Sequence, residues 1–116
     1  MFQYGLNGIR IAGLTSRLNL LSIFAILAGV LCFLLKVSVI EQVMVLVCIV
    51  IVFAFEMVNT SIELICNMIE PNQNIKIKEI KDISAGAVLL SALGSGIVGW
   101  IIFMPKLVNL FLLIKP

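Results

Sequence analysis

Three long apolar runs alternate with short polar segments along this chain. The runs cover residues 18–35, 41–69 and 83–104. A helix needs roughly 20 mostly apolar residues to cross the hydrocarbon core of a bilayer, and each run approaches or exceeds that length. The pattern therefore predicts an all-α membrane protein with three transmembrane helices in a single domain, residues 1–116.

The ends of the second and third runs carry helix boundary signals. Ser38 followed three residues later by Glu41 has the form of a capping box, which predicts a helix start. Pro71 should end the second helix and Pro105 the third, because proline interrupts the backbone hydrogen-bond ladder. Residues 70–82 form the sustained polar segment of the chain, and we expect them to be a loop in water.

The segment before the first run, residues 2–17, has a partial amphipathic pattern. Phe2, Leu6 and Ile9 fall on one helical face. A helix of this kind lies in the plane of the membrane surface with its apolar face buried among the lipid headgroups. We therefore expect an N-terminal interfacial amphipathic helix.

The positive charges indicate how the chain is oriented. Five of the eight lysines and arginines lie before the first run or in the 70–82 segment. Cytoplasmic segments of membrane proteins carry an excess of such charges. We therefore expect a multi-pass protein of the inner (cytoplasmic) membrane, with its N-terminus and the 70–82 loop in the cytoplasm.

The composition narrows the range of functions. Apolar residues make up 62% of the chain and charged residues 12%, and the net charge is only +2 with no basic run, so nucleic-acid binding is set aside. The chain has no histidine, which removes histidine-based catalysis and histidine zinc sites. Its three cysteines stand singly in apolar stretches and match neither a disulfide framework nor a metal site.

A polar stripe interrupts the second apolar run. Its members follow one another at spacings of three, four and four residues, which places them within about 80° of arc on one helix face. They are Glu56, Asn59, Glu63 and Asn67. A carboxylate at the centre of a bilayer costs about 2.5–3.5 kcal/mol, so such residues normally face a protein interior or a wet cavity.

These side chains offer the chemistry of phosphoryl transfer. Oxygen ligands of this kind suit Mg²⁺, which takes one or two carboxylates and completes its shell with water and phosphate oxygens. Lys81 and Asp82 should lie at the start of the third span, on the same membrane face as the end of the stripe. A base, a metal ligand and a cation that neutralises phosphate would then lie together.

Two other interpretations of the stripe stay open on the residues alone. The stripe could act only as polar contacts between the helices of a bundle. It could also line an ion or proton path, although its residues cluster at one membrane face and a path should reach both. The chain has no Walker A sequence. Residues 94–99 match the sequence pattern of a dinucleotide-binding motif, but they lie inside an apolar run with no strand before them, so we do not expect them to bind a dinucleotide.

The chain resembles the small prokaryotic diacylglycerol kinase and undecaprenol kinase family. The resemblance is carried by EMVNTSIE at 56–63 and KDISAGAVLL at 81–90, together with FQY at 2–4, Gly8 and FMPK at 103–106. The family pattern is E-x-x-N-[ST]-[AS]-I-E followed, after a loop, by K-D-x-x-[AS]-[AG]-A-V. The resemblance extends over nearly the whole chain.

This resemblance implies a homotrimer of three-span subunits, each with a surface helix. It also implies an enzyme that uses MgATP to phosphorylate a lipid alcohol at the cytoplasmic interface, among the membrane lipids. Undecaprenol is the expected substrate, because residues 85–90 and 103–107 look more like the Gram-positive and cyanobacterial branch of the family. Diacylglycerol, which would give phosphatidic acid, is the alternative.

The resemblance also implies roles for individual residues. Glu56 would be the general base for the lipid hydroxyl, and Asn59 a second catalytic residue that supports the geometry of metal and phosphate. Glu63 would bind Mg²⁺ and, through it, the nucleotide. The other residues expected to contact ATP are Tyr4, Asn72, Asn74, Lys81 and Asp82.

Three positions depart from the family pattern. Ser16 stands where many relatives carry an acidic residue, Asn67 where they have an aspartate, and Asn74 where the polar loop has a histidine. One expected metal carboxylate and one further acid are therefore absent. These departures imply weaker metal binding, or a catalytically impaired family member that acts as a non-enzymatic membrane assembly protein.

Overall fold

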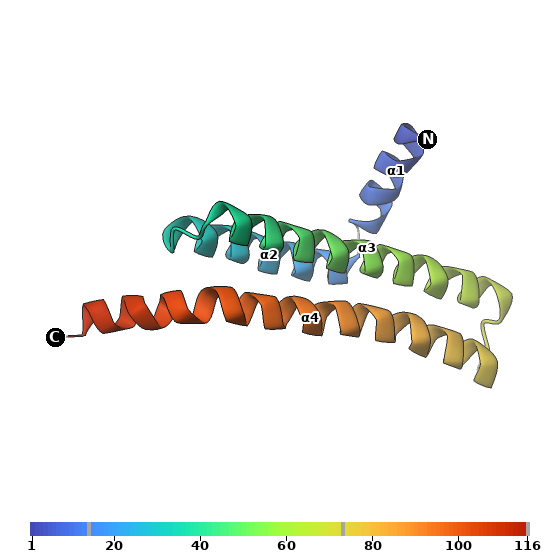
Figure 1. The fold of residues 1–116 in the computed structure, drawn as a ribbon. Helices are drawn as coiled ribbons and strands as arrows, with labels where there is room; N and C mark the ends of the chain where they lie inside the picture. The colour runs from blue at the N-terminus through green and yellow to red at the C-terminus, as the bar shows by residue number, and fades with distance from the viewer. Residues whose placement is uncertain (14, 73, 116) are drawn as a thin grey trace.

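The computed structural model describes residues 1–13, 15–72 and 74–115, and this part of the chain folds into four helices (Figure 1). They are α1 (Phe2–Ala12), α2 (Ser16–Leu34), α3 (Val39–Ile69) and α4 (Ile75–Ile114). Helices α2, α3 and α4 are each long and apolar enough to cross a membrane. The expected all-α class with three membrane-spanning helices is confirmed at this level.

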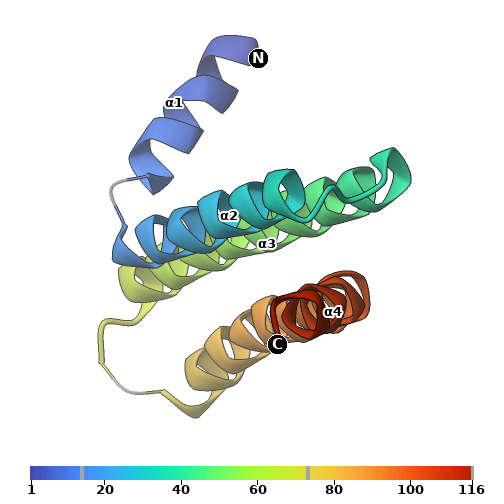
Figure 2. The ribbon, with the colours of Figure 1, turned by 90° about the vertical axis from the view of Figure 1, so that its left-hand side faces the viewer.

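The three long helices form an elongated bundle. α3 packs against both α2 and α4, and more extensively against α4. α1 projects away from the bundle near the start of α2 (Figure 2). Most of the large apolar side chains on the three long helices are exposed in the single chain, which leaves them available to contact lipid or other subunits.

Helices α2 and α3 lie close to their predicted positions. α2 spans Ser16–Leu34, where the sequence predicts 18–35. The Ser38 hydroxyl accepts a hydrogen bond of 3.3 Å from the Glu41 backbone N–H and donates one of 2.9 Å to the Glu41 carboxylate, so the predicted cap starts α3. α3 ends at Ile69, just before Pro71.

The prediction of a loop over residues 70–82 is wrong for residues 75–82, which form the first two turns of α4. The connection from α3 is residues 70–74, of which residue 73 lies outside the described part of the chain. Asn74 starts the helix, because its side-chain oxygen accepts a hydrogen bond of 2.9 Å from the Lys76 backbone N–H. Polarity alone does not end a helix, and residues 75–82 contain neither glycine nor proline.

The prediction that Pro105 ends the third helix is also wrong. α4 continues through Pro105 to Ile114 and is 40 residues long, in place of the expected 83–104. Proline removes one backbone donor, but helices in apolar surroundings tolerate this loss when local adjustments satisfy the freed carbonyl. At 1.5 Å per residue α4 is about 60 Å long, roughly twice the hydrocarbon thickness of a bilayer.

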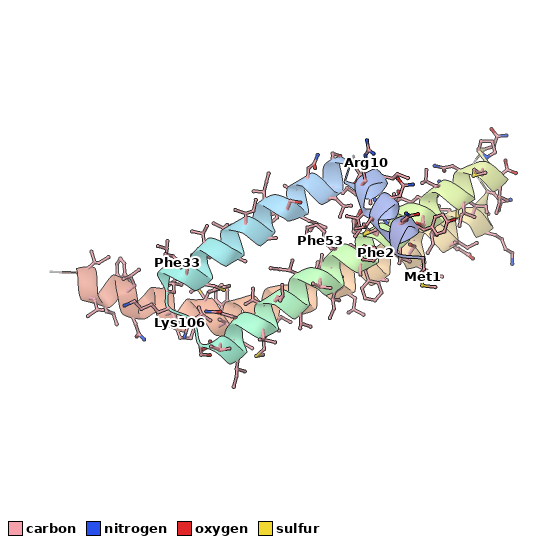
Figure 3. All side chains as sticks on the ribbon, turned by 90° about the horizontal axis from the view of Figure 1, so that it is seen from above. Met1, Phe2, Arg10, Phe33, Phe53 and Lys106 are labelled. Atoms are coloured by element: carbon pink, nitrogen blue, oxygen red, sulfur yellow. The ribbon has the colours of Figure 1, made fainter. Side chains whose placement is uncertain are left out.

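The buried apolar core lies at the end of the bundle where α2 turns into α3. Val37 from that turn, Val45 from α3 and Ile102 from α4 form it. Lys106, labelled in Figure 3 far from Met1, lies beside this core, and its Nζ is 3.3 Å from Glu41 Oε1. The core and this ion pair hold α4 against α3, which aligns α4 with the polar stripe at the other end of α3.

Candidate active site

The first two residues of the polar stripe on α3 are buried even in the single chain. Glu56 is 4% exposed and Asn59 is 2% exposed. Their spacing of three residues puts them on the same face of α3, and the next residue of the stripe follows one turn later. A buried carboxylate is stable only when it is paired, hydrogen-bonded or bound to a cation, so the partners of Glu56 decide what this site can do.

Arg17, in the first turn of α2, is the partner of both glutamates. Its Nη1 lies 3.0 Å from Glu63 Oε1 and its Nη2 lies 3.2 Å from Glu63 Oε2, which is the parallel two-bond geometry that guanidinium and carboxylate groups favour. The same Nη1 lies 3.3 Å from Glu56 Oε1. One guanidinium group therefore bridges two carboxylates that are two helical turns apart on α3.

Sequence reasoning missed this role of Arg17 and used the residue only to orient the chain. A signal was present, because a buried carboxylate requires a nearby cation and Arg17 lies at the start of the first span, on the expected side of the membrane. The spacing within α3 could not supply the link. The contacts join residues 39 and 46 positions apart in the sequence.

Asn59 is hydrogen-bonded on one side only. Its Nδ2 donates a bond of 3.3 Å to Glu63 Oε1, which also fixes the orientation of the amide. Its Oδ1 is buried and has no hydrogen-bond partner in the described part of the chain. Such an unsatisfied acceptor is costly, and it marks a place where a ligand, a metal ion or water would be bound.

The end of the stripe meets α4 through Lys81. Lys81 Nζ donates a hydrogen bond of 2.6 Å to Asn67 Oδ1, so Lys81 does lie beside the stripe. Asp82 behaves differently, because its Oδ2 is 2.6 Å from Lys78 Nζ on the exposed surface of α4. The hydrogen bonds found among the described residues thus join Lys81 to the stripe but leave Asp82 paired within α4.

The connection between α3 and α4 forms a hollow of about 460 Å³ that is lined by both polar and apolar side chains. Its lining includes Asn72, Asn74, Lys78 and Lys81. Asn72 is held by its backbone N–H, which donates a hydrogen bond of 3.1 Å to the Glu70 carboxylate. Two lysines and two asparagines outnumber the one carboxylate of the lining, that of Glu70. This excess of positive charge, next to the end of the stripe, suits an anionic ligand such as a nucleotide phosphate chain.

Tyr4, another predicted site residue, also lies apart from the stripe. It lies on α1 and is 81% exposed. α1 projects away from the bundle in Figure 2, and no hydrogen bond among the described residues joins Tyr4 to the stripe. A contact between Tyr4 and a nucleotide therefore stays a prediction.

The donor set of the stripe fits Mg²⁺ when phosphate oxygens share the metal. Within the described ranges there is no group of three or more acidic, cysteine or histidine side chains that could enclose a metal ion. Mg²⁺ usually takes only one or two carboxylates and fills its shell with phosphate and water. The Glu63 carboxylate and the unpartnered Asn59 Oδ1 are oxygen ligands of the right kind.

An apolar cavity of about 500 Å³ lies between α2, α3 and α4. Val52 and Phe53 line its wall on α3, three to four residues before Glu56 (Phe53 is labelled in Figure 3). Phe24 lines it from α2 and Gly96 from α4. The buried carboxylate therefore lies about one helical turn from a cavity that suits an acyl or isoprenoid chain.

Comparison with known proteins agrees with this picture. The family model described as prokaryotic diacylglycerol kinase matches residues 3–103. Undecaprenol kinase of Bacillus subtilis (strain 168) is 39% identical to this chain over 75 residues, which make up 65% of this chain and 61% of that relative. The chain therefore matches about three fifths of the length of this relative. No solved structure matches the chain significantly.

Proposed function

Because the chain belongs to the prokaryotic diacylglycerol kinase family, we propose that it is a lipid kinase that transfers a phosphoryl group from ATP to a lipid alcohol at the membrane surface. One observation carries the proposal. A buried carboxylate, Glu56, lies between an apolar cavity and a polar end of the bundle that contains Glu63 and Lys81. A carboxylate buried in a membrane-spanning helix is costly and therefore points to a functional site.

The proposed substrate is undecaprenol. The Bacillus subtilis relative is named for that substrate, and the cavity between the three long helices is lined almost entirely by apolar side chains. An isoprenoid chain in this cavity would bring its primary hydroxyl toward Glu56. Diacylglycerol, which the family description names, is the alternative substrate.

In this mechanism Glu56 is the general base. Its carboxylate takes the proton of the lipid hydroxyl, whose oxygen forms a bond to the γ-phosphorus of ATP. The bond from that phosphorus to the bridging oxygen breaks at the same time, and ADP leaves with the electron pair. Proton transfer to a positioned side chain typically accelerates such a step by about 10²–10⁴-fold.

The remaining polar residues would hold the nucleotide. Glu63 and Asn59 would bind Mg²⁺, which when present neutralises the phosphate oxygens and holds them in place. Lys81 would contact the phosphate chain from the hollow at the α3–α4 connection. The other proposed nucleotide contacts are Tyr4, Asn72, Asn74 and Asp82.

We further propose a homotrimer with its N-terminus and the α3–α4 connection in the cytoplasm. Helices α2, α3 and α4 bury only 11%, 22% and 6% of the residues in their most apolar windows, so a single chain leaves most of their surface to be covered. α1 would lie on the cytoplasmic surface of the membrane, with Phe2, Leu6 and Ile9 among the lipids, since these side chains are exposed in the structure.

One observation favours a second candidate, a non-catalytic assembly protein. Arg17 already pairs with both Glu56 and Glu63 within one chain, so the stripe can be satisfied without substrate or metal. In that case the stripe would serve only to join helices.

A phosphorylation assay with two lipids distinguishes these proposals. The purified protein in lipid nanodiscs would receive [γ-³²P]ATP and either undecaprenol or diacylglycerol, with Mg²⁺ or with EDTA. The kinase proposal expects label in undecaprenol at a higher rate than in diacylglycerol, and only with Mg²⁺. Label in neither lipid would reject the kinase and favour the assembly protein.

A further inference from the structure

The Arg17 guanidinium occupies the oxygens that a metal at Glu63 would need. Both carboxylate oxygens of Glu63 accept a hydrogen bond from it, at 3.0 and 3.2 Å. A divalent cation bound to the same carboxylate would lie a few ångströms from the guanidinium, and two positive charges at such a distance repel each other. Arg17 and a metal ion therefore compete for Glu63.

The Arg17 guanidinium can move away from the two glutamates. Its side chain is 55% exposed, whereas the Glu56 side chain is 6% exposed. Arg17 also lies in the first turn of α2, next to the end of the helix. The long side chain can therefore move its charged end into water without unfolding a packed element, while Glu56 stays in place.

Arg17 also leaves the site incomplete. The guanidinium pairs with the two glutamates, but the buried Asn59 Oδ1 beside them still has no partner among the described residues. An ion pair that served only to join α2 to α3 would not require this unsatisfied acceptor. The acceptor points to a second occupant of the same site, one that binds oxygen atoms.

We infer that Arg17 is a counter-ion that competes with the metal and so sets the metal affinity of the site. This inference rests on the kinase function proposed above. Without a ligand, Arg17 holds Glu56 and Glu63. When a divalent cation binds with a nucleotide, Arg17 is displaced, and Glu63 and Asn59 Oδ1 become metal ligands. The apparent Kd for the metal is then the intrinsic Kd divided by the fraction of protein in which Arg17 has left the site.

Metal binding by variants of the full chain tests this inference. Binding of Mn²⁺ would be followed by electron paramagnetic resonance in nanodiscs, with a non-hydrolysable ATP analogue present. Arg17→Gln should lower the apparent Kd for Mn²⁺ about tenfold if the ion pair holds the site about nine tenths of the time. Lys36→Gln, which removes the same charge at the opposite end of α2, should leave the Kd unchanged.

A second variant and a second measurement protect the test against misfolding. Arg17→Lys keeps the charge but loses the two-bond geometry, so it should lower the Kd by a smaller factor. In thermal unfolding with EDTA, the effects of Arg17→Gln and Glu63→Gln should be non-additive. Saturating Mn²⁺ with the analogue should remove this coupling between the two residues. If the ion pair were purely structural, the coupling would remain when the metal is present.

The outcomes separate this inference from the kinase proposal. Wild-type protein that binds Mn²⁺, with an unchanged or raised Kd in Arg17→Gln, would overturn the competing role of Arg17 and leave the kinase proposal intact. Mn²⁺ binding that is absent from the wild type and both Arg17 variants would overturn the metal site itself, and with it both proposals.

Discussion

Lys106 Nζ lies 3.3 Å from Glu41 Oε1, and this ion pair joins α4 to α3 at the end of the bundle remote from Arg17. Glu41 also accepts a hydrogen bond from Ser38, the residue that caps α3. The same carboxylate therefore contributes to the start of one helix and to the packing of another. It lies beside the apolar core and about 33 Å along α3 from Glu63, so its function is structural.

Lys106→Gln should lower the thermal unfolding midpoint by about 2–5 °C without altering catalysis, because it removes one partly exposed ion pair. The midpoint would be measured by the change in helical circular dichroism in detergent. Lys115→Gln removes the same charge from the exposed end of α4 and should leave the midpoint unchanged. Equal midpoints for Lys106→Gln and the wild type would show that this pair contributes nothing to stability.

Local signals in the sequence predict most of the fold, and they fail where two signals compete. The Ser38 cap and the second apolar run predict α3 correctly, because the cap acts within the first turn and no competing signal interrupts the run before Pro71. At Pro105 a helix-breaking residue competes with apolar residues on both sides, and the helix continues. Residues 75–82 show the reverse case, in which polarity predicts a loop although Asn74 supplies a helix cap.

The sequence predicts only those parts of the candidate site whose residues all lie on one helix. The spacing of the stripe placed Glu56, Asn59 and Glu63 on one face, and the structure has them there. The bonds from Arg17 to Glu56 and Glu63 depend on how α2 packs against α3, which no periodicity within either helix encodes. Partners of a buried charge must therefore be sought across helices.

Glu56→Gln should lower kcat for lipid phosphorylation by about 10²–10⁴-fold, because the amide cannot take the proton of the lipid hydroxyl. The substitution keeps the size of the side chain, so the assembly should stay intact by size-exclusion chromatography. Phosphorylated undecaprenol would be measured under saturating ATP and Mg²⁺.

Glu79→Gln is the matched control for Glu56→Gln, because it makes the same chemical change at an exposed position of α4. It should leave kcat unchanged. A Glu56→Gln protein with wild-type kcat would remove Glu56 as the general base. A change in assembly with no turnover in the wild type would instead favour a stripe that only joins helices.

Lys81→Gln should raise the KM for ATP about tenfold with a smaller effect on kcat, because it removes a charge that would bind phosphate before the reaction begins. Lys81→Arg retains the charge and should restore much of the affinity. Both variants lose the 2.6 Å bond to Asn67, or alter it. Asn67→Ala therefore serves as the control, and if it raises the KM as much as Lys81→Gln does, the effect comes from helix packing.

Asn74 has two proposed functions, and one pair of substitutions separates them. Its side-chain oxygen caps α4 at 2.9 Å from the Lys76 backbone N–H, and the residue also lines the hollow proposed for the nucleotide. Asn74→Ala should lower the stability by about 1 kcal/mol, the typical cost of losing an N-cap. Asn74→Ser keeps a capping oxygen and should keep most of that stability, measured by thermal unfolding. If Asn74 also contacts ATP, both variants should raise the KM for ATP, because serine is too short to reach a ligand in the hollow. A KM that rises only in Asn74→Ala, in step with lost stability, would assign Asn74 to the helix start alone.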